Sequence, residues 1–172
     1  MSHADSVFTI RDLREDDAEK CASIVRANWG DALYYNALLE IAEMFGSSRW
    51  RPHYFVAEID GKIVGYAGFK TAWILWNVKE LVWVNVLPEY QGFGVGSALT
   101  EHRLKKLRED ETALALLMTK RRSFFKKFGF VEAADLDGWA LMFLKLGPIT
   151  IQPSDREALE VKEIIESLRR NH

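Results

Sequence analysis

The stretch that decides the fold is Val86-Leu87-Pro88-Glu89-Tyr90-Gln91-Gly92-Phe93-Gly94-Val95-Gly96-Ser97-Ala98-Leu99. It overlaps the end of a strand pattern at 80–86, which is apolar from Leu81 to Val86 except at Asn85, and it leads into a helical pattern from about Gly94 to Arg108. Glycines at positions 92, 94 and 96 leave the backbone uncovered, so that main-chain N–H groups can point into one concavity at the helix N-terminus. Such a concavity binds a phosphate or a pyrophosphate.

Two common phosphate motifs do not fit this stretch. A dinucleotide site requires Gly-x-Gly-x-x-Gly, and the last glycine would fall on Ser97 or on Leu99. A P-loop requires Gly-Lys-Ser/Thr after the glycines, and no such triplet follows Gly96. The spacing therefore argues against a Rossmann oxidoreductase and against a P-loop nucleotidase.

The surrounding periodicity predicts an α/β domain with a mixed sheet. We expect strands at 7–11, 54–59, 62–70, 80–86, 112–118, 130–133 and 139–146, and helices at about 12–27, 35–45, 94–108 and 123–128. Asp60-Gly61 between two apolar runs predicts a tight hairpin. Gly65 and Gly68 indicate a bulge or a close backbone approach. The nearly continuous apolar run at 80–86 predicts a central strand buried on both faces.

The composition is that of one globular domain with a short appendage: 172 residues, 48% hydrophobic, 28% charged and a net charge of −2. Nothing in this charge balance indicates nucleic acid binding. The single cysteine, Cys21, cannot form an internal disulfide, and no cysteine or histidine spacing suits zinc, so we expect no metal. Cys21 lies in a predicted amphipathic helix, where a small core filler is the simpler interpretation.

The two ends of the chain give further expectations. Ser2 to Ser6 is polar, no apolar region follows, and no apolar run approaches a membrane span, so we expect a cytoplasmic protein without membrane contact. Gly147-Pro148 divides the chain into a domain at 1–147 and an extension at 148–172. An apolar stripe on the extension, Ala158, Val161, Ile165 and Leu168, predicts an amphipathic helix that packs on its own domain or on a second subunit of a homodimer.

Four segments together resemble the GNAT superfamily of acetyltransferases. Residues 86–99 meet every fixed position of its acetyl-CoA signature, V-x-P-x-[FY]-[QR]-[GR]-x-G-x-[GA]-x-x-L. Ile10-Arg11 followed by Asp17 resembles its first strand and helix entry, and 56–65 resembles its second hairpin. Phe124-Phe125-Lys126-Lys127-Phe128-Gly129-Phe130 resembles its closing F-Y-x-x-x-G-F segment. The resemblance covers residues 8 to 146.

This resemblance implies a mostly antiparallel central sheet flanked by helices and an acetyl-CoA-dependent N-acetyltransferase that moves an acyl group directly to a primary amine of a small molecule or a peptide. It implies that the CoA pyrophosphate is held by the main chain of Gln91, Gly92, Phe93, Gly94, Val95, Gly96 and Ser97. The pantetheine arm would then pair with the backbone at Asn85 and Val86. The basic clusters at 103–106 and 120–127 would lie near the CoA phosphates.

The catalytic residues are less well marked. Glu80 is the candidate general base, because it is the acid on the strand nearest the expected reaction centre. The family often places a tyrosine acid where this chain has Phe125, and a phenyl ring cannot donate a proton. Ser123 is the weaker candidate for the acid, and water can protonate the thiolate instead. The alternative function is an acyl-CoA-binding regulatory or interaction module with little or no turnover.

Overall fold

The computed structural model describes residues 8–48 and 50–149 and, beyond them, Leu159, Lys162, Glu163, Ile165, Glu166, Arg169 and Arg170. These seven residues are helical and exposed. The rest of the predicted C-terminal helix, with most of its apolar stripe, lies outside the described residues.

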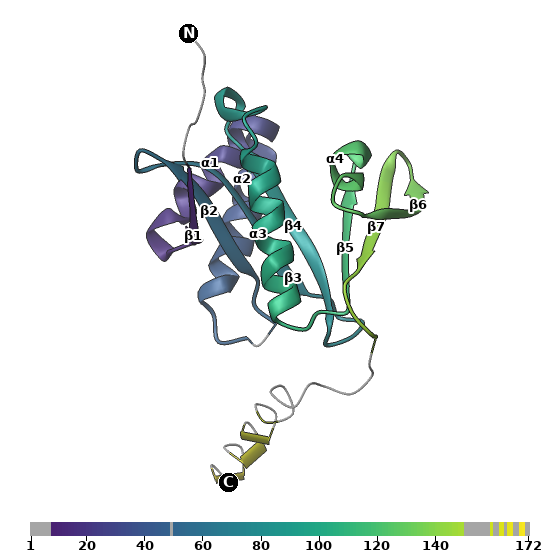
Figure 1. Ribbon diagram of the computed structural model, residues 1–172. Helices are drawn as coiled ribbons and strands as arrows, with labels where there is room; N and C mark the ends of the chain where they lie inside the picture. Colours follow the sequence, from purple (N-terminus) through teal and green to yellow (C-terminus); the bar gives the residue numbers. More distant parts are fainter. Residues whose placement is uncertain are drawn as a thin grey trace.

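Within residues 8–48 and 50–149, seven strands form one mixed sheet in the order β1-β2-β3-β4-β5-β7-β6 (Figure 1). The strands are β1 (Thr9–Asp12), β2 (His53–Ile59), β3 (Lys62–Thr71), β4 (Val78–Val86), β5 (Leu114–Thr119), β6 (Val131–Leu136) and β7 (Trp139–Lys145). Every neighbouring pair is antiparallel except β4 with β5, which run parallel. The predicted order of elements and the mixed, mostly antiparallel sheet are both confirmed.

Helices cover both faces of the β1–β4 part of the sheet. The helices that cover it are α1 (Ala18–Trp29), α2 (Asp31–Ala42) and α3 (Val95–Glu109). A short fourth helix, α4 (Arg122–Lys126), lies beside β5 and β7. In Figure 1, α3 lies across one face and α1 and α2 lie across the other. Two apolar clusters match this arrangement: one joins α3 to the sheet through Leu99 and Leu107, and the other joins α1 and α2 to it through Ile24 and Ile41.

The glycines of β2 and β3 have the roles that the sequence predicts. Asp60 and Gly61 turn the hairpin with positive φ of 49° and 76°. A Cβ at Gly65 would lie 3.0 Å from the Asn85 carbonyl oxygen, and a Cβ at Gly68 would lie 2.5 Å from Cε1 of Tyr54. Both glycines therefore permit close approaches, and the β3–β4 register shifts between Tyr66 and Gly68.

Strand β4 is central, but the prediction that it is buried on both faces is wrong in part. Val82, Trp83, Val84 and Val86 are only half-buried, whereas Leu81 is buried. The reason lies in its parallel neighbour: β4 pairs with β5 only at Val78, Lys79 and Glu80. Both strands continue past this point without pairing, so one edge of β4 remains open.

Cys21 lies on the inner face of α1 and is completely buried, as a core filler should be. Burial also raises the pKa of its thiol well above the ordinary value. Among the described residues no helix is long and apolar enough to cross a membrane.

Candidate active site

The glycine-rich turn lies at the N-terminus of α3, beside the open edge of β4. Gly92 and Gly94 adopt positive φ of 85° and 84°, and a Cβ at either position would meet no atom within 4 Å. The first hydrogen bond of the helix runs from Ala98 N–H to the Gly94 carbonyl. The amides of Val95, Gly96 and Ser97 therefore have no acceptor within the helix. An open backbone with outward N–H groups fits a pyrophosphate.

The main chain of Val86 faces the open edge of β4. Leu87 N–H donates to Val64 O at 2.8 Å, so the main-chain groups of Leu87 and Asn85 point toward β3 and those of Val86 point the other way. Two amide side chains donate to the Val86 carbonyl, Asn28 Nδ2 and Gln91 Nε2, each at 3.0 Å. Gln91 Nε2 also donates to Asn28 Oδ1 at 2.9 Å. The end of β4, the glycine turn and α1 are thus fastened together.

The side chain of Asn85 also connects β4 to α1. It is buried, and its Oδ1 accepts hydrogen bonds from Trp29 Nε1 at 2.9 Å and from Asn28 Nδ2 at 3.4 Å. Its main chain pairs with Tyr66 of β3. The sequence did not reveal Asn28 and Trp29, because no motif marks two residues at the end of a helix as partners of a strand 56–58 positions away.

A bulge interrupts β4 next to the open edge. Tyr66 pairs with Asn85 and Gly68 pairs with Val82, so Trp83 and Val84 together oppose the single residue Ala67. Trp83 has a positive φ of 41°, which is unusual for a bulky residue. Its indole N–H donates to Glu40 Oε2 of α2 at 2.6 Å. This hydrogen bond therefore connects the bulge to α2, which covers one face of the sheet.

Glu80 lies where β4 and β5 separate. Its register partner Leu116 is the last residue of β5 that pairs with β4. Its carboxylate is 3.6 Å from Lys70 Nζ and its side chain is 40% exposed. The pKa of the Tyr54 hydroxyl is raised, mainly by burial and to a smaller extent by the nearby negative charges of Glu40, Glu43 and Glu80. Glu80 thus shares the α2 side of the sheet with two other carboxylates that the sequence did not single out.

Helix α4 contains Ser123, the candidate acid for the leaving group, and Phe125, which stands at the usual tyrosine position. Ser123 is exposed. Phe125 is only 7% exposed and packs edge-to-face against Phe124 and Phe130, so it is a core residue. Phe124 lies closer to the turn, because a Cβ at Gly96 would be 3.8 Å from its Cζ, and 3.7 Å from both Val84 and Val86.

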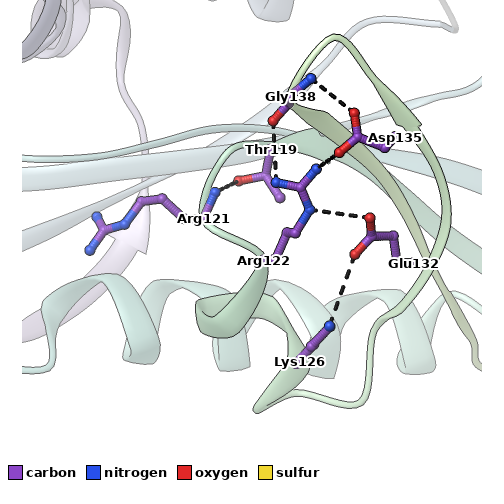
Figure 2. A network of polar contacts seen from close by, with 7 residues as sticks. All are labelled: Thr119, Arg121, Arg122, Lys126, Glu132, Asp135 and Gly138. Carbon is purple, nitrogen blue, oxygen red and sulfur yellow. Dashed lines mark hydrogen bonds and ion pairs between the residues drawn. The ribbon is translucent and has the colours of Figure 1, made fainter.

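The basic residues divide into different roles. Figure 2 shows Arg122 bound to Glu132 and Asp135 and to the Gly138 carbonyl, which ties α4 to the β6–β7 hairpin. Lys126 adds an ion pair with Glu132, whereas the side chain of Arg121 points away from this network. The expectation that Arg103 belongs to a basic cluster near the CoA phosphates is wrong, because its side chain is completely buried on the inner face of α3. Among the described residues no group of three His, Cys, Asp or Glu side chains is placed to hold a metal ion.

Comparison with known proteins agrees with this geometry. Residues 50–132 match the family model of the acetyltransferase (GNAT) domain. An N-alpha-acetyltransferase of Sulfurisphaera tokodaii is 28% identical over 140 residues, which cover 73% of this chain and 81% of the relative. One of Saccharolobus solfataricus is 26% identical over 147 residues, which cover 77% of this chain and 85% of the relative.

Solved structures share the fold. PaiA N-acetyltransferase of Thermoplasma acidophilum, in complex with coenzyme A, superposes with a TM-score of 0.68 at 21% identity and covers 81% of this chain and 99% of its own. A GNAT family acetyltransferase of Brucella melitensis, in complex with acetyl-CoA, has a TM-score of 0.67 at 24% identity, over 87% and 95% of the two chains. The family match, the relatives, the sheet order and the glycine turn beside the open strand lead to one conclusion: the chain contains a GNAT acetyltransferase domain, matched over residues 50–132, and this domain and the relatives support an N-acetyltransferase.

Proposed function

We propose that the chain transfers an acetyl group from acetyl-CoA directly to a primary amine, and that this amine is the α-amino group of a polypeptide. The observation that carries the direct transfer is the separation of β4 from β5 beside the glycine turn. This opening lets a thioester lie along β4 while an amine approaches from the α1–α2 side. The polypeptide acceptor is supported by the relatives named N-alpha-acetyltransferases.

The cofactor would bind along one continuous path. The main chain of residues 91–97 would hold the pyrophosphate at the N-terminus of α3. The pantetheine arm would pair with the outward main-chain N–H of Val86, because Asn28 and Gln91 already donate to the Val86 carbonyl. The Asn85 side chain would keep β4 attached to α1. Arg121, which directly precedes α4 and points away from the Arg122 network, is a candidate cation for a CoA phosphate.

The chemistry requires proximity, an oxyanion donor and a path for protons. The neutral amine attacks the thioester carbonyl carbon, a C–N bond forms and the C–S bond breaks. A main-chain N–H at the separated end of β4 would stabilise the negative charge that develops on the carbonyl oxygen. One proton leaves the amine nitrogen and one reaches the CoA thiolate, so the products are an N-acetyl amide and CoA thiol.

Glu80 is the proposed base for the incoming ammonium. We expect Glu80→Gln to lower kcat about 100-fold, and to do so most below about pH 7.7, the ordinary pKa of an α-amino group. Above that pH the amine loses its proton to solvent and the base matters less. The measurement is the pH profile of kcat for both proteins with one peptide acceptor.

Lys70→Met is the matched control for Glu80. Lys70 is the ion-pair partner of Glu80 and pairs with it across β3 and β4. A purely structural role for Glu80 would make both substitutions equally harmful. If Glu80→Gln leaves kcat unchanged at every pH, Glu80 has no part in the mechanism.

Direct transfer predicts that the lone thiol takes no part. Cys21 is completely buried, so it cannot reach a thioester in the open edge of β4. We therefore expect Cys21→Ala to retain the wild-type kcat. We also expect double-reciprocal plots of the initial rate, with one substrate varied at several fixed concentrations of the other, to give intersecting and not parallel lines. Parallel lines, together with loss of activity in the Cys21 variant, would establish an acetyl-enzyme route instead.

The departing thiolate has no tyrosine to protonate it at position 125. Phe125 is part of the core, and Ser123 on α4 has a hydroxyl whose proton is too weakly acidic to be an effective donor. Water at the open edge of β4 is the simpler proton source, because a thiolate with an ordinary pKa of about 8.5 is a tolerable leaving group.

The acceptor class can be tested with paired substrates. Thiol release from acetyl-CoA is measured with a peptide that has a free N-terminus and no lysine, and with an N-terminally blocked peptide that contains a lysine. Polyamines and aminoglycosides complete the panel. Release with the first peptide alone supports the proposal. Release with the small amines alone would keep the transferase chemistry and reject the polypeptide acceptor.

A second candidate function is an acyl-CoA-binding module with weak turnover. The buried Phe125 favours it, because the usual tyrosine hydroxyl is missing from α4. Binding of acetyl-CoA by calorimetry without thiol release across the whole panel would favour this function over the enzyme.

A further inference from the structure

Arg103 is a charged residue inside the apolar face of α3. It lies one turn from Leu99 and from Leu107 along the helix, and its side chain is completely buried. Burial lowers the pKa of its guanidinium to about 9, which still leaves the group cationic at neutral pH. Within the described residues its guanidinium donates to main-chain and hydroxyl oxygens, not to a carboxylate.

The guanidinium holds the two carbonyls beside the bulge of β4. Nη1 donates to Gly68 O at 2.9 Å and to Val82 O at 3.2 Å, and these two residues form the first pair of the ladder next to the bulge. Within the described residues, Nε has no hydrogen-bond partner. Nη1 of Arg103 thus donates to the main chain of β3 and β4 and forms no ion pair among the described residues.

A second branch joins Arg103 to the glycine turn. Its Nη2 donates to Thr100 Oγ1 at 3.1 Å, and Thr100 Oγ1 donates to Gly96 O at 2.9 Å. One side chain therefore connects the bulge of β4 with the first turn of α3. These are the two parts of the chain that the proposed acetyl-CoA path follows.

The bulge needs such support. Trp83 occupies the left-handed region at φ 41°, and a bulky residue stays in this conformation only when its surroundings enforce it. The indole of Trp83 is held by Glu40 on the α2 side of the sheet, and Arg103 holds the adjacent carbonyls from the α3 side. A buried cation without an acidic partner is unfavourable for stability, so an apolar residue of similar size would pack at lower cost.

We propose that Arg103 is a positioning residue for acetyl transfer: by bridging Gly68 O and Val82 O it fixes the bulge that presents the main chain of β4 to the thioester end of acetyl-CoA. This inference rests on the proposed function. Arg103 acts through the main chain and touches no substrate, so its loss should affect the thioester end of the site more than the pyrophosphate end.

Arg103→Met is the main test, because methionine fills the space without a donor. Arg108→Met, on the exposed side of the same helix, is the matched control. We expect the Arg103 variant to bind acetyl-CoA about tenfold more weakly and to lose at least about tenfold in kcat. Its affinity for 3′-phospho-ADP, the nucleotide part of CoA without the pantetheine arm, should stay unchanged.

A nuclear magnetic resonance measurement complements the comparison of acetyl-CoA affinity with 3′-phospho-ADP affinity. The indole N–H resonance of Trp83, assigned by its loss in Trp83→Phe, should shift in the Arg103 variant and not in the Arg108 variant. A folded Arg103→Met protein with wild-type kcat and acetyl-CoA affinity overturns the proposal. Equal loss of affinity for acetyl-CoA and for 3′-phospho-ADP also overturns it, because that pattern indicates general loosening of the site.

Arg103→Lys keeps the test decisive if the methionine variant does not fold. Lysine retains the charge but is too short and compact to bridge both carbonyls as a guanidinium does, so intermediate values are expected. Wild-type values in the lysine variant would overturn the proposal. A wild-type protein that transfers acetyl to no acceptor would refute the proposed function alone, and the comparison of the two affinities would still decide the role of Arg103.

Discussion

Replacing Gly94 by aspartate is expected to weaken acetyl-CoA binding by about a thousandfold. Gly94 has a φ of 84° and forms the N-cap of α3, where the pyrophosphate is proposed to bind. Two like charges about 4 Å apart repel by about 4 kcal/mol at the dielectric constant typical of a protein surface, and each 1.4 kcal/mol or so corresponds to a factor of ten. Isothermal calorimetry with acetyl-CoA measures the change.

Gly94→Asn is the control for this substitution. Asparagine has nearly the same shape as aspartate and tolerates the left-handed backbone, but it carries no charge. We expect it to bind acetyl-CoA far better than the aspartate variant does. Unchanged affinity in Gly94→Asp would reject the assignment of residues 91–97 to the pyrophosphate, and equal losses in both variants would assign the effect to shape instead of charge.

Replacing Gly68 by alanine is expected to cost about 2–3 kcal/mol of the free energy of unfolding. The new Cβ would lie 2.5 Å from Cε1 of Tyr54 and 2.7 Å from the His53 carbonyl oxygen. Tyr54 is completely buried, and its ring cannot move aside without disturbing the core beneath α2. For a protein of this size the melting temperature should fall by roughly 4–12 °C, which calorimetry or circular dichroism can follow.

Gly147→Ala provides the comparison for Gly68. The nearest atom to its new Cβ is the Thr112 carbonyl oxygen at 3.5 Å, an ordinary contact. We expect this variant to melt within about 2 °C of the wild type, since a substitution without a clash changes stability little. A Gly68→Ala protein as stable as this control would show that Tyr54 has another place for its ring.

The sequence predicts well those features that depend on neighbouring residues. The hairpin at Asp60-Gly61 and the glycine turn at 92–96 are confirmed, because glycine and aspartate near a turn restrict the backbone locally. The order of the elements follows from hydrophobic periodicity in the same way. The buried Cys21 also agrees with its place on an amphipathic helix.

The remaining features depend on contacts between distant parts of the chain. Asn28 of α1 donates a hydrogen bond to Val86 of β4, and Trp83 of β4 donates one to Glu40 of α2. No local sequence pattern specifies either contact. Arg103 differs, because its helical spacing from Leu99 and Leu107 already indicates the buried face. Its neighbours Lys105 and Lys106 led to its placement in a basic cluster near the CoA phosphates, whereas the helical period places it correctly on the buried face.

The brief pairing of β4 with β5 has a consequence for how the molecule holds together. The main-chain ladder between the two strands covers Val78–Glu80 and Leu114–Leu116, with adjoining hydrogen bonds from Ala113 and Leu114 to Asn77. The sheet therefore consists of a larger wing, β1 to β4, and a smaller wing, β5 to β7, that meet at a short seam. A ligand that lies between the wings supplies contacts to both, so its binding free energy adds to the cohesion of the fold. Acetyl-CoA bound along β4 as proposed would therefore stabilise the folded protein until the reaction consumes it.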